Sequence, residues 1–166
     1  MRIIYFLLVT TCIYFNGFSK TSLYHHCPEM FKDTSKIVIY IEEIANALRY
    51  ELTEDSLRIV YMPETEGGKD SVIFQTSMPD KQGFKRLLLN KNIDTLKESY
   101  SNNCIADGLV LNIVFVRGNK EKSVNIGNCY LADIAPVIKF LNGISPESLK
   151  IWYDKEILLK MQQDCK

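Results

Sequence analysis

The stretch from Leu109 to Asn128 constrains the fold more than any other part of the chain. Two β-rich runs flank Gly118-Asn119, and a dipeptide of this kind is typical of the two-residue turn between antiparallel strands. If it forms the turn, the residue numbers of cross-strand partners sum to 237, and Leu111 faces Ile126. The apolar residues of the two runs then fall opposite each other. The sequence therefore predicts two antiparallel strands in this register.

The first of these two strands is apolar on both faces. Val110, Val114 and Val116 lie on the side opposite Leu111 and Ile113, whereas a strand with one solvated face alternates apolar and polar residues. We therefore expect this strand to lie in the centre of a sheet or to be covered on both sides.

A second pair of strands is predicted upstream. Residues 57–62 and 71–76 form two β-rich runs, and the polar, turn-forming residues 63–70 join them. This pattern predicts an antiparallel pair with a mobile loop at its tip. Residues 84–89 are interpreted as a third strand, with a helical turn as the alternative, and residues 149–153 as a last strand.

Apolar residues also recur at helical spacing. In residues 37–52 they lie four, three, four and four positions apart, which predicts a helix that carries Glu42 and Glu43 on its exposed face. The β-branched residues at 37–39 oppose its first turn, because they lose side-chain freedom in a helix. Shorter helices are expected from about residue 92, from 134 to 141 with Asp133 as its cap and Gly143 as its end, and from 155 to 164 with Asp154 as its cap.

Together these elements predict an α+β fold. The strands are linked as hairpins rather than through strand-helix-strand crossovers, so we expect a mainly antiparallel sheet with helices packed mainly on one face. A chain of 166 residues has room for one ordinary domain. Residues 33–166 are assigned to it.

The N-terminus has the anatomy of a signal peptide. Arg2 precedes the apolar run Ile3–Phe15, and small residues follow at Gly17 and Ser19. The run of 13 residues is shorter than the roughly 20 that a spanning helix needs. This length favours cleavage over a permanent anchor.

Cleavage gives the chain a location. We expect residues 1–19 to be removed as the signal peptide and residues 20–32 to form a leader ahead of the domain. The mature protein is then periplasmic or extracellular. Lipidation at Cys12, or an N-terminus that stays uncleaved, would instead leave it anchored to a membrane.

Export also changes how the cysteines are interpreted. Of the five cysteines, Cys12 leaves with the signal peptide and an even set of four remains, as is common in disulfide-bonded proteins of oxidising compartments. Four cysteines allow three connectivities. We expect Cys104 to pair with Cys129 across the strand pair, and Cys27 to pair with Cys165 so that the two ends are joined. Free thiols are the alternative.

The charge of the chain excludes one class of partner. Lysine plus arginine and aspartate plus glutamate number 20 each, which gives a net charge of zero. The mature chain, with 19 basic and 20 acidic residues, has a charge of −1. No segment is rich in lysine or arginine, so the attraction to phosphate that nucleic-acid binders use is missing. Nucleic acid is therefore not expected as a partner.

Familiar motifs of catalysis and cofactor binding do not occur in the sequence. The glycines form no phosphate-binding loop, no serine precedes a lysine by three residues, and the spacings of zinc-protease and calcium-loop ligands are missing. His25 and His26 are the two histidines, and neighbours in an extended segment point to opposite sides. No cofactor and no metal site are therefore predicted.

The function that we expect from these observations is that of a small exported binding protein. Its partner is expected to be another extracytoplasmic protein, in an inhibitor, immunity or accessory role. Tyr and Trp are favoured anchors of interfaces, although a solvated loop and a packed core are the alternatives for these segments. The candidate contact residues are Glu64, Glu66, Lys69, Asp70, Trp152 and Tyr153.

A second function stays open beside this one. Glycoside hydrolysis needs only two carboxyl groups that face each other. The alternative is therefore a small secreted hydrolase that uses a carboxylate pair, or one that uses His25 and His26.

Overall fold

The strand pair expected around Gly118-Asn119 is present in the computed structural model as β6 (Val110–Arg117) and β7 (Lys120–Gly127). Leu111 faces Ile126, so the predicted register is confirmed. Gly118 adopts a positive φ of 58° in the turn, a conformation that is readily available to glycine.

The structure describes residues 37–63, 68–89, 93–102, 104–105 and 108–164. These residues belong to one compact unit, residues 31–166. The predicted signal peptide, residues 1–19, and the predicted leader, residues 20–32, lie outside the described residues and stay predictions. In the described ranges, no helix is both long enough and apolar enough to cross a bilayer.

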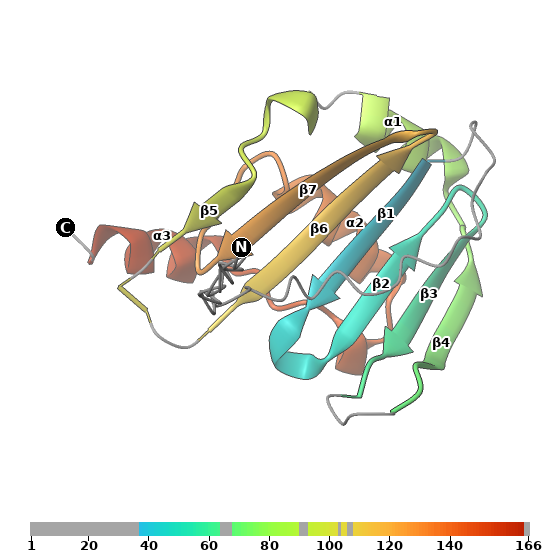
Figure 1. Ribbon diagram of the computed structural model, residues 1–166, viewed down its shortest axis with the longest axis horizontal. Coiled ribbons are helices and arrows are strands. Elements are labelled where there is room, and N and C mark those ends of the chain that lie inside the picture. Colours follow the sequence, from blue (N-terminus) through green and yellow to red (C-terminus); the bar gives the residue numbers. More distant parts are fainter. Residues whose placement is uncertain (1–36, 64–67, 90–92, 103, 106–107, 165–166) are drawn as a thin grey trace, which may run out of the picture. The chain divides into compact units, whose positions relative to one another are not determined.

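In these ranges seven strands form one sheet in the order β4-β3-β2-β1-β6-β7-β5 (Figure 1). Neighbouring strands run antiparallel, except β5 and β7, which are parallel. The other strands are β1 (Ile37–Glu43), β2 (Leu48–Leu52), β3 (Ser56–Tyr61), β4 (Ser71–Ser77) and β5 (Ser99–Ser101). The helices are α1 (Lys81–Leu89), α2 (Ala135–Ile144) and α3 (Lys155–Gln163), with single 3₁₀ turns at η1 (Ile44–Asn46), η2 (Ile93–Thr95) and η3 (Glu147–Leu149). The protein has an α+β fold.

Two expectations about the strands are confirmed. β6 lies between β1 and β7, and Val114, which points away from the main core, is buried as well. A strand that is apolar on both faces is thus central, as its sequence predicts. β3 also pairs antiparallel with β4 across the polar connection of residues 63–70.

The helix expected over residues 37–52 is wrong. The segment forms β1 and β2, which pair antiparallel with Ile41 opposite Tyr50. The apolar spacing fits a helix, but Ile37, Ile39 and Ile41 also alternate as they do in a strand, and β-branched side chains favour strands. Pairing of β1 with β6 favours the extended form further, and this partner lies far away in the sequence.

The strand expected over residues 84–89 is wrong too, because this segment belongs to α1. Asp80 Oδ1 accepts a hydrogen bond from the Gly83 backbone N–H at 2.7 Å, which satisfies one of the donors that the first turn of a helix leaves unpaired. Phe84 is fully buried while Lys85 and Arg86 are exposed. One helical face is thus apolar and the other is solvated.

The C-terminal part follows the prediction only in places. α2 is present, but the residue before it, Ile134, makes no side-chain cap hydrogen bond, and the helix continues past Gly143. Asp154 does cap α3, since its Oδ1 accepts from the Ile157 N–H at 2.8 Å. Residues 149–153 belong to no strand of the described sheet, and the helix expected near residue 92 is only the single turn η2.

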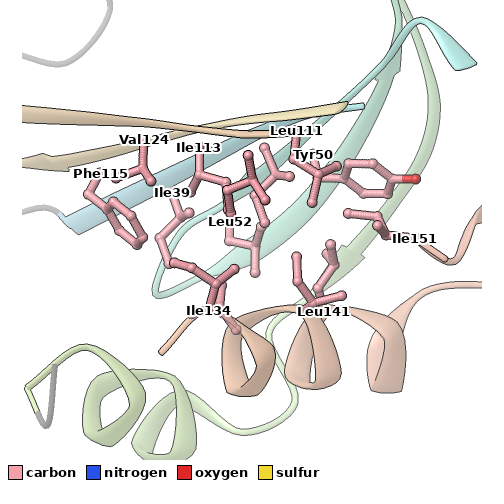
Figure 2. Close-up of a cluster of buried hydrophobic side chains, with 14 of the residues drawn as sticks. Ile39, Tyr50, Leu52, Leu111, Ile113, Phe115, Val124, Ile134, Leu141 and Ile151 are labelled. Atoms are coloured by element: carbon pink, nitrogen blue, oxygen red, sulfur yellow. The ribbon is translucent and has the colours of Figure 1, made fainter. Parts of the chain in front are cut away.

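The main core cluster joins side chains of the sheet to side chains of the helical segments (Figure 2). Side chains at alternate positions of β1, β2, β6 and β7 meet side chains at the start of α2, within it and after η3. The buried cluster includes Ile39, Leu52, Ile113, Val124, Ile134, Leu141 and Ile151. This packing fixes the sheet, and therefore the position of its edges.

Candidate interaction surface

The strand β4 forms one edge of the sheet. Its only strand neighbour in the described part of the chain is β3. Among the described residues, no strand pairs with the backbone N–H and C=O groups along its outer side, and such groups can pair with another strand. Edge strands are usually blunted by charged residues or proline, yet no charged residue occurs from Ser71 to Pro79.

Two apolar side chains of β4 are open to solvent at this edge. Val72 is 47% exposed and Ile73 is 46% exposed. Tyr61, at the end of β3, is exposed to a similar degree. Scattered exposed apolar residues are normal on a protein surface, but here two are consecutive on a strand that also has a free backbone edge.

A β-bulge interrupts the pairing of β3 with β4 at these two residues. Ile59 and Val60 are consecutive on β3, but their partners on β4 are Phe74 and Val72. Ile73 is therefore an extra residue without an opposite number on β3. A bulge bends its strand and re-aims the side chains around it.

An ion-pair network holds the start of β4. Arg49 on β2 donates to Glu51 at 3.1 Å and to Asp70 at 2.9 Å, and Arg58 on β3 lies 3.0 Å from the other carboxylate oxygen of Glu51. The side chains of Arg49 and Glu51 are only 16% and 12% exposed. Burial lowers the pKa of Arg49, but the hydrogen bonds and charges of Glu51 and Asp70 outweigh it and raise that pKa. The network therefore ties Asp70 to the sheet.

The predicted contact residues fall into two separate places. Lys69 and Asp70 are exposed at the start of β4, whereas Glu64 and Glu66 lie outside the described residues. Trp152 is exposed in the segment after η3, and no hydrogen bond or ion pair in the described ranges joins it to the residues before β4. Asp70 is engaged by Arg49, so Lys69 is the more available of the two.

Tyr153 is partly buried and makes hydrogen bonds within the domain. Its hydroxyl accepts a hydrogen bond from the Leu131 N–H at 2.8 Å and lies 3.4 Å from the Cys129 carbonyl oxygen. Burial raises the pKa of Tyr153 to about 12. The interpretation of residues 151–153 as core is thus right for Ile151 and Tyr153, while Trp152 points to solvent.

The predicted Cys104–Cys129 disulfide is wrong. Cys129 is a free thiol within the buried cluster, whereas Cys104 is exposed in the loop after β5. Because the Cys129 thiol is free, Cys129 does not pair with Cys104. Cys27 and Cys165 lie outside the described residues, and their pairing stays a prediction.

The adjacent residues Glu42 and Glu43 do not face each other. Glu42 and Glu43 are neighbours on β1 and not on an exposed helical face, so they point to opposite sides of the sheet. Glu42 Oε2 accepts from Asn112 Nδ2 at 3.1 Å, and Glu43 is buried beside Tyr50. In the described part of the chain, no three His, Cys, Asp or Glu side chains gather as metal ligands. His25 and His26 lie outside it.

The residues that define the edge surface, Val72, Ile73 and Arg49, are not among the sequence predictions. One available signal is the uncharged run from Ser71 to Pro79. Comparison with known proteins adds no candidate: no family model, no curated protein and no solved structure matches the chain. The function is therefore inferred from the residues themselves.

Proposed function

We propose that the protein is exported and acts by binding another extracytoplasmic protein along the free edge of β4. The observation that carries this proposal is an uncharged edge strand with two consecutive exposed apolar residues, Val72 and Ile73. A strand of the partner would form backbone hydrogen bonds to β4 and pack its side chains on Val72 and Ile73. Export rests on the N-terminal sequence, Arg2 followed by Ile3–Phe15.

The bulge and the ion-pair network support selective binding of a partner strand at this edge. Regular pairing is interrupted at Ile73, so a partner strand has to match a bend as well as a row of hydrogen-bonding groups. Arg49 fixes Asp70 immediately before the strand, which limits movement of its first residue. Both features restrict the register in which a partner can bind, as an inhibitor or immunity protein requires.

The finer architecture belongs to the same proposal. We infer that the strands are linked as hairpins and that the helices pack mainly on one face of the sheet. In this arrangement β4 is approached from the side, away from the helices that cover the core. A partner strand would extend the sheet beyond β4 without disturbing the packing around Leu52 and Leu141.

Substitution at the bulge tests the proposal. Ile73→Lys places a charge on the edge, which is how natural proteins prevent strand addition, and is expected to abolish recovery of the specific partner from the envelope of the native host. Ile157→Lys on α3 is the matched control, because Ile157 is 44% exposed against 46% for Ile73. A partner that binds the Ile73→Lys protein as well as the original would contradict the proposal.

The oligomeric state provides a second readout. If the original chain sediments as a dimer and the Ile73→Lys chain as a monomer, the edge is occupied by a second copy instead. That result would contradict a partner of a different kind.

A further inference from the structure

The Tyr50 hydroxyl has two acceptors within hydrogen-bonding distance but only one hydrogen. Its oxygen lies 3.1 Å from the Leu149 carbonyl oxygen and 3.3 Å from Glu43 Oε2. A hydroxyl donates one hydrogen bond and accepts up to two. Both contacts are satisfied together only if one neighbour donates to Tyr50. A backbone carbonyl has no hydrogen to donate, so of the two neighbours only a protonated Glu43 carboxyl can act as the donor.

Burial favours this protonated form. Glu43 is 5% exposed and Tyr50 is fully buried, and Figure 2 shows Tyr50 beside Leu111 at the end of the core cluster. No ion pair among the described residues includes Glu43. An ionised carboxylate without a cation is costly in such a place. Burial accordingly raises the pKa of Glu43, although hydrogen bonds from Asn46 and Tyr50 lower it in part.

We propose that Glu43 is a proton-controlled link between the end of β1 and the segment around η3. In the protonated state the carboxyl O–H donates to the Tyr50 oxygen, and the Tyr50 O–H donates to the Leu149 carbonyl. When a base in the solvent removes the carboxyl proton, the Tyr50 hydrogen turns to the carboxylate, because a charged acceptor forms the stronger bond. The Leu149 carbonyl then loses its donor.

We assign the titration of this link to Glu43 after considering the other ionisable residues of the neighbouring elements. From the start of α2 to Lys150, the ionisable residues are Lys139, Glu147 and Lys150, and Glu147 pairs with Lys150. Arg49 on β2 and Glu42 on β1 point to the opposite face of the sheet. The stretch of β6 opposite Glu43, around Leu111, carries no ionisable side chain.

When the Leu149 carbonyl loses its donor, we expect η3 to loosen before the residues that follow it. Asn142 holds Ile151 through two hydrogen bonds, from its Nδ2 to the Ile151 carbonyl at 2.8 Å and from the Ile151 N–H to its Oδ1 at 2.9 Å. Ile151 therefore stays anchored. In the described part of the chain, the N–H groups of Leu149 and Lys150 bond to the preceding turn, at Pro146 and Glu147. We expect these bonds to loosen when the Leu149 carbonyl is freed.

Amide hydrogen exchange of the full-length protein tests the link. At each pH, exchange at Leu149 and Lys150 is compared between the original protein and Glu43→Gln, whose neutral amide still donates to Tyr50. We expect the exchange rate of the original protein, divided by that of Glu43→Gln, to be near one in acid. This ratio should rise by about three- to tenfold as the pH increases, which is the equivalent of one ordinary hydrogen bond. A ratio that stays constant across the whole pH range would overturn the proposal.

Two further variants keep the test decisive if Glu43→Gln fails to fold. Tyr50→Phe has no hydroxyl to give to Leu149, so fast exchange at Leu149 and Lys150 is expected at every pH. Glu42→Gln, on the same strand but the opposite face, is expected to keep the pH-dependent rise. A rise that survives in Tyr50→Phe, or disappears in Glu42→Gln, would overturn the assignment to Glu43.

Discussion

Arg49 and Asp70 form an ion pair with 2.9 Å between Nη2 and Oδ2, which ties the start of β4 to β2 across the intervening strand β3. Asp70 is half exposed, whereas Arg49 is nearly covered and also bonds Glu51. The two members of the pair therefore differ in what their removal costs.

Loss of Asp70 is expected to affect stability little. An exposed ion pair contributes about 0 to 1 kcal/mol, so Asp70→Asn should lower the free energy of unfolding by less than about 1 kcal/mol. Arg49→Met should cost more, about 1 to 3 kcal/mol, because it leaves the covered Glu51 carboxylate short of a hydrogen bond. Urea unfolding followed by circular dichroism measures both. Equal losses in the two variants would contradict the asymmetry.

Two glycines are expected to respond to alanine in opposite directions. Gly118 has a φ of 58°, and a residue with a Cβ pays about 1 to 2 kcal/mol for this left-handed conformation, so Gly118→Ala should destabilise the protein. Gly143 lies within α2, and the space that a Cβ would occupy there is open, so Gly143→Ala should stabilise it by about 0.5 to 1 kcal/mol. Thermal unfolding of the two variants compares the signs. Stabilisation by Gly118→Ala would show that the turn differs from the one described.

Cys129 is expected to resist alkylation in the folded protein. It is a free thiol that is almost fully buried, and reagents reach such a thiol only when the protein unfolds. Iodoacetamide followed by peptide mass spectrometry without reduction should label Cys129 in denaturant but not in its absence. Recovery of a peptide that joins Cys129 to Cys104 would contradict the structure.

The protein is expected to become less stable as the pH rises through the titration range of Glu43. Its folded pKa is raised, so the folded state holds a proton that the unfolded state has already released, and stability decreases as the pH rises from the unfolded pKa of about 4.5 to the folded pKa. Above the folded pKa this contribution stays constant. Relative to Glu43→Gln, the folding equilibrium constant should fall by up to about tenfold per pH unit within that window. If the original protein instead lost stability relative to Glu43→Gln as the pH falls, the result would contradict the raised pKa of Glu43.

The sequence predicts those parts of the fold that depend on close neighbours. The register of β6 and β7 follows from the turn at Gly118, and the start of α3 from the cap at Asp154. The helix predicted over residues 37–52 is wrong because one apolar pattern suits both a helix and a pair of strands. Pairing with the distant strand β6 favours the strands. β5 is missed since three polar and aromatic residues, Ser99 to Ser101, carry no periodic signal and join the sheet through β7.

The candidate surface is harder to predict for the same reason. Residues 71–76 are recognisable as a strand, but only the strand order of the described sheet shows that β4 pairs with a strand on one side alone. The exposure of Val72 and Ile73 depends on that order and on a bulge set by the pairing with β3. Trp152 is identified from its residue type alone, and its neighbour Tyr153 is not distinguished from it because both are aromatic.

The most direct test of the proposed function is photo-crosslinking from the edge in the native host. A photoreactive side chain at position 73 should give one specific crosslinked protein, and the same side chain at position 157 should not capture that protein. Mapping the crosslink should place the partner's reacting residue in an extended strand. Crosslinking of the same protein from position 157 alone, or no specific product from position 73, would contradict binding at the edge of β4.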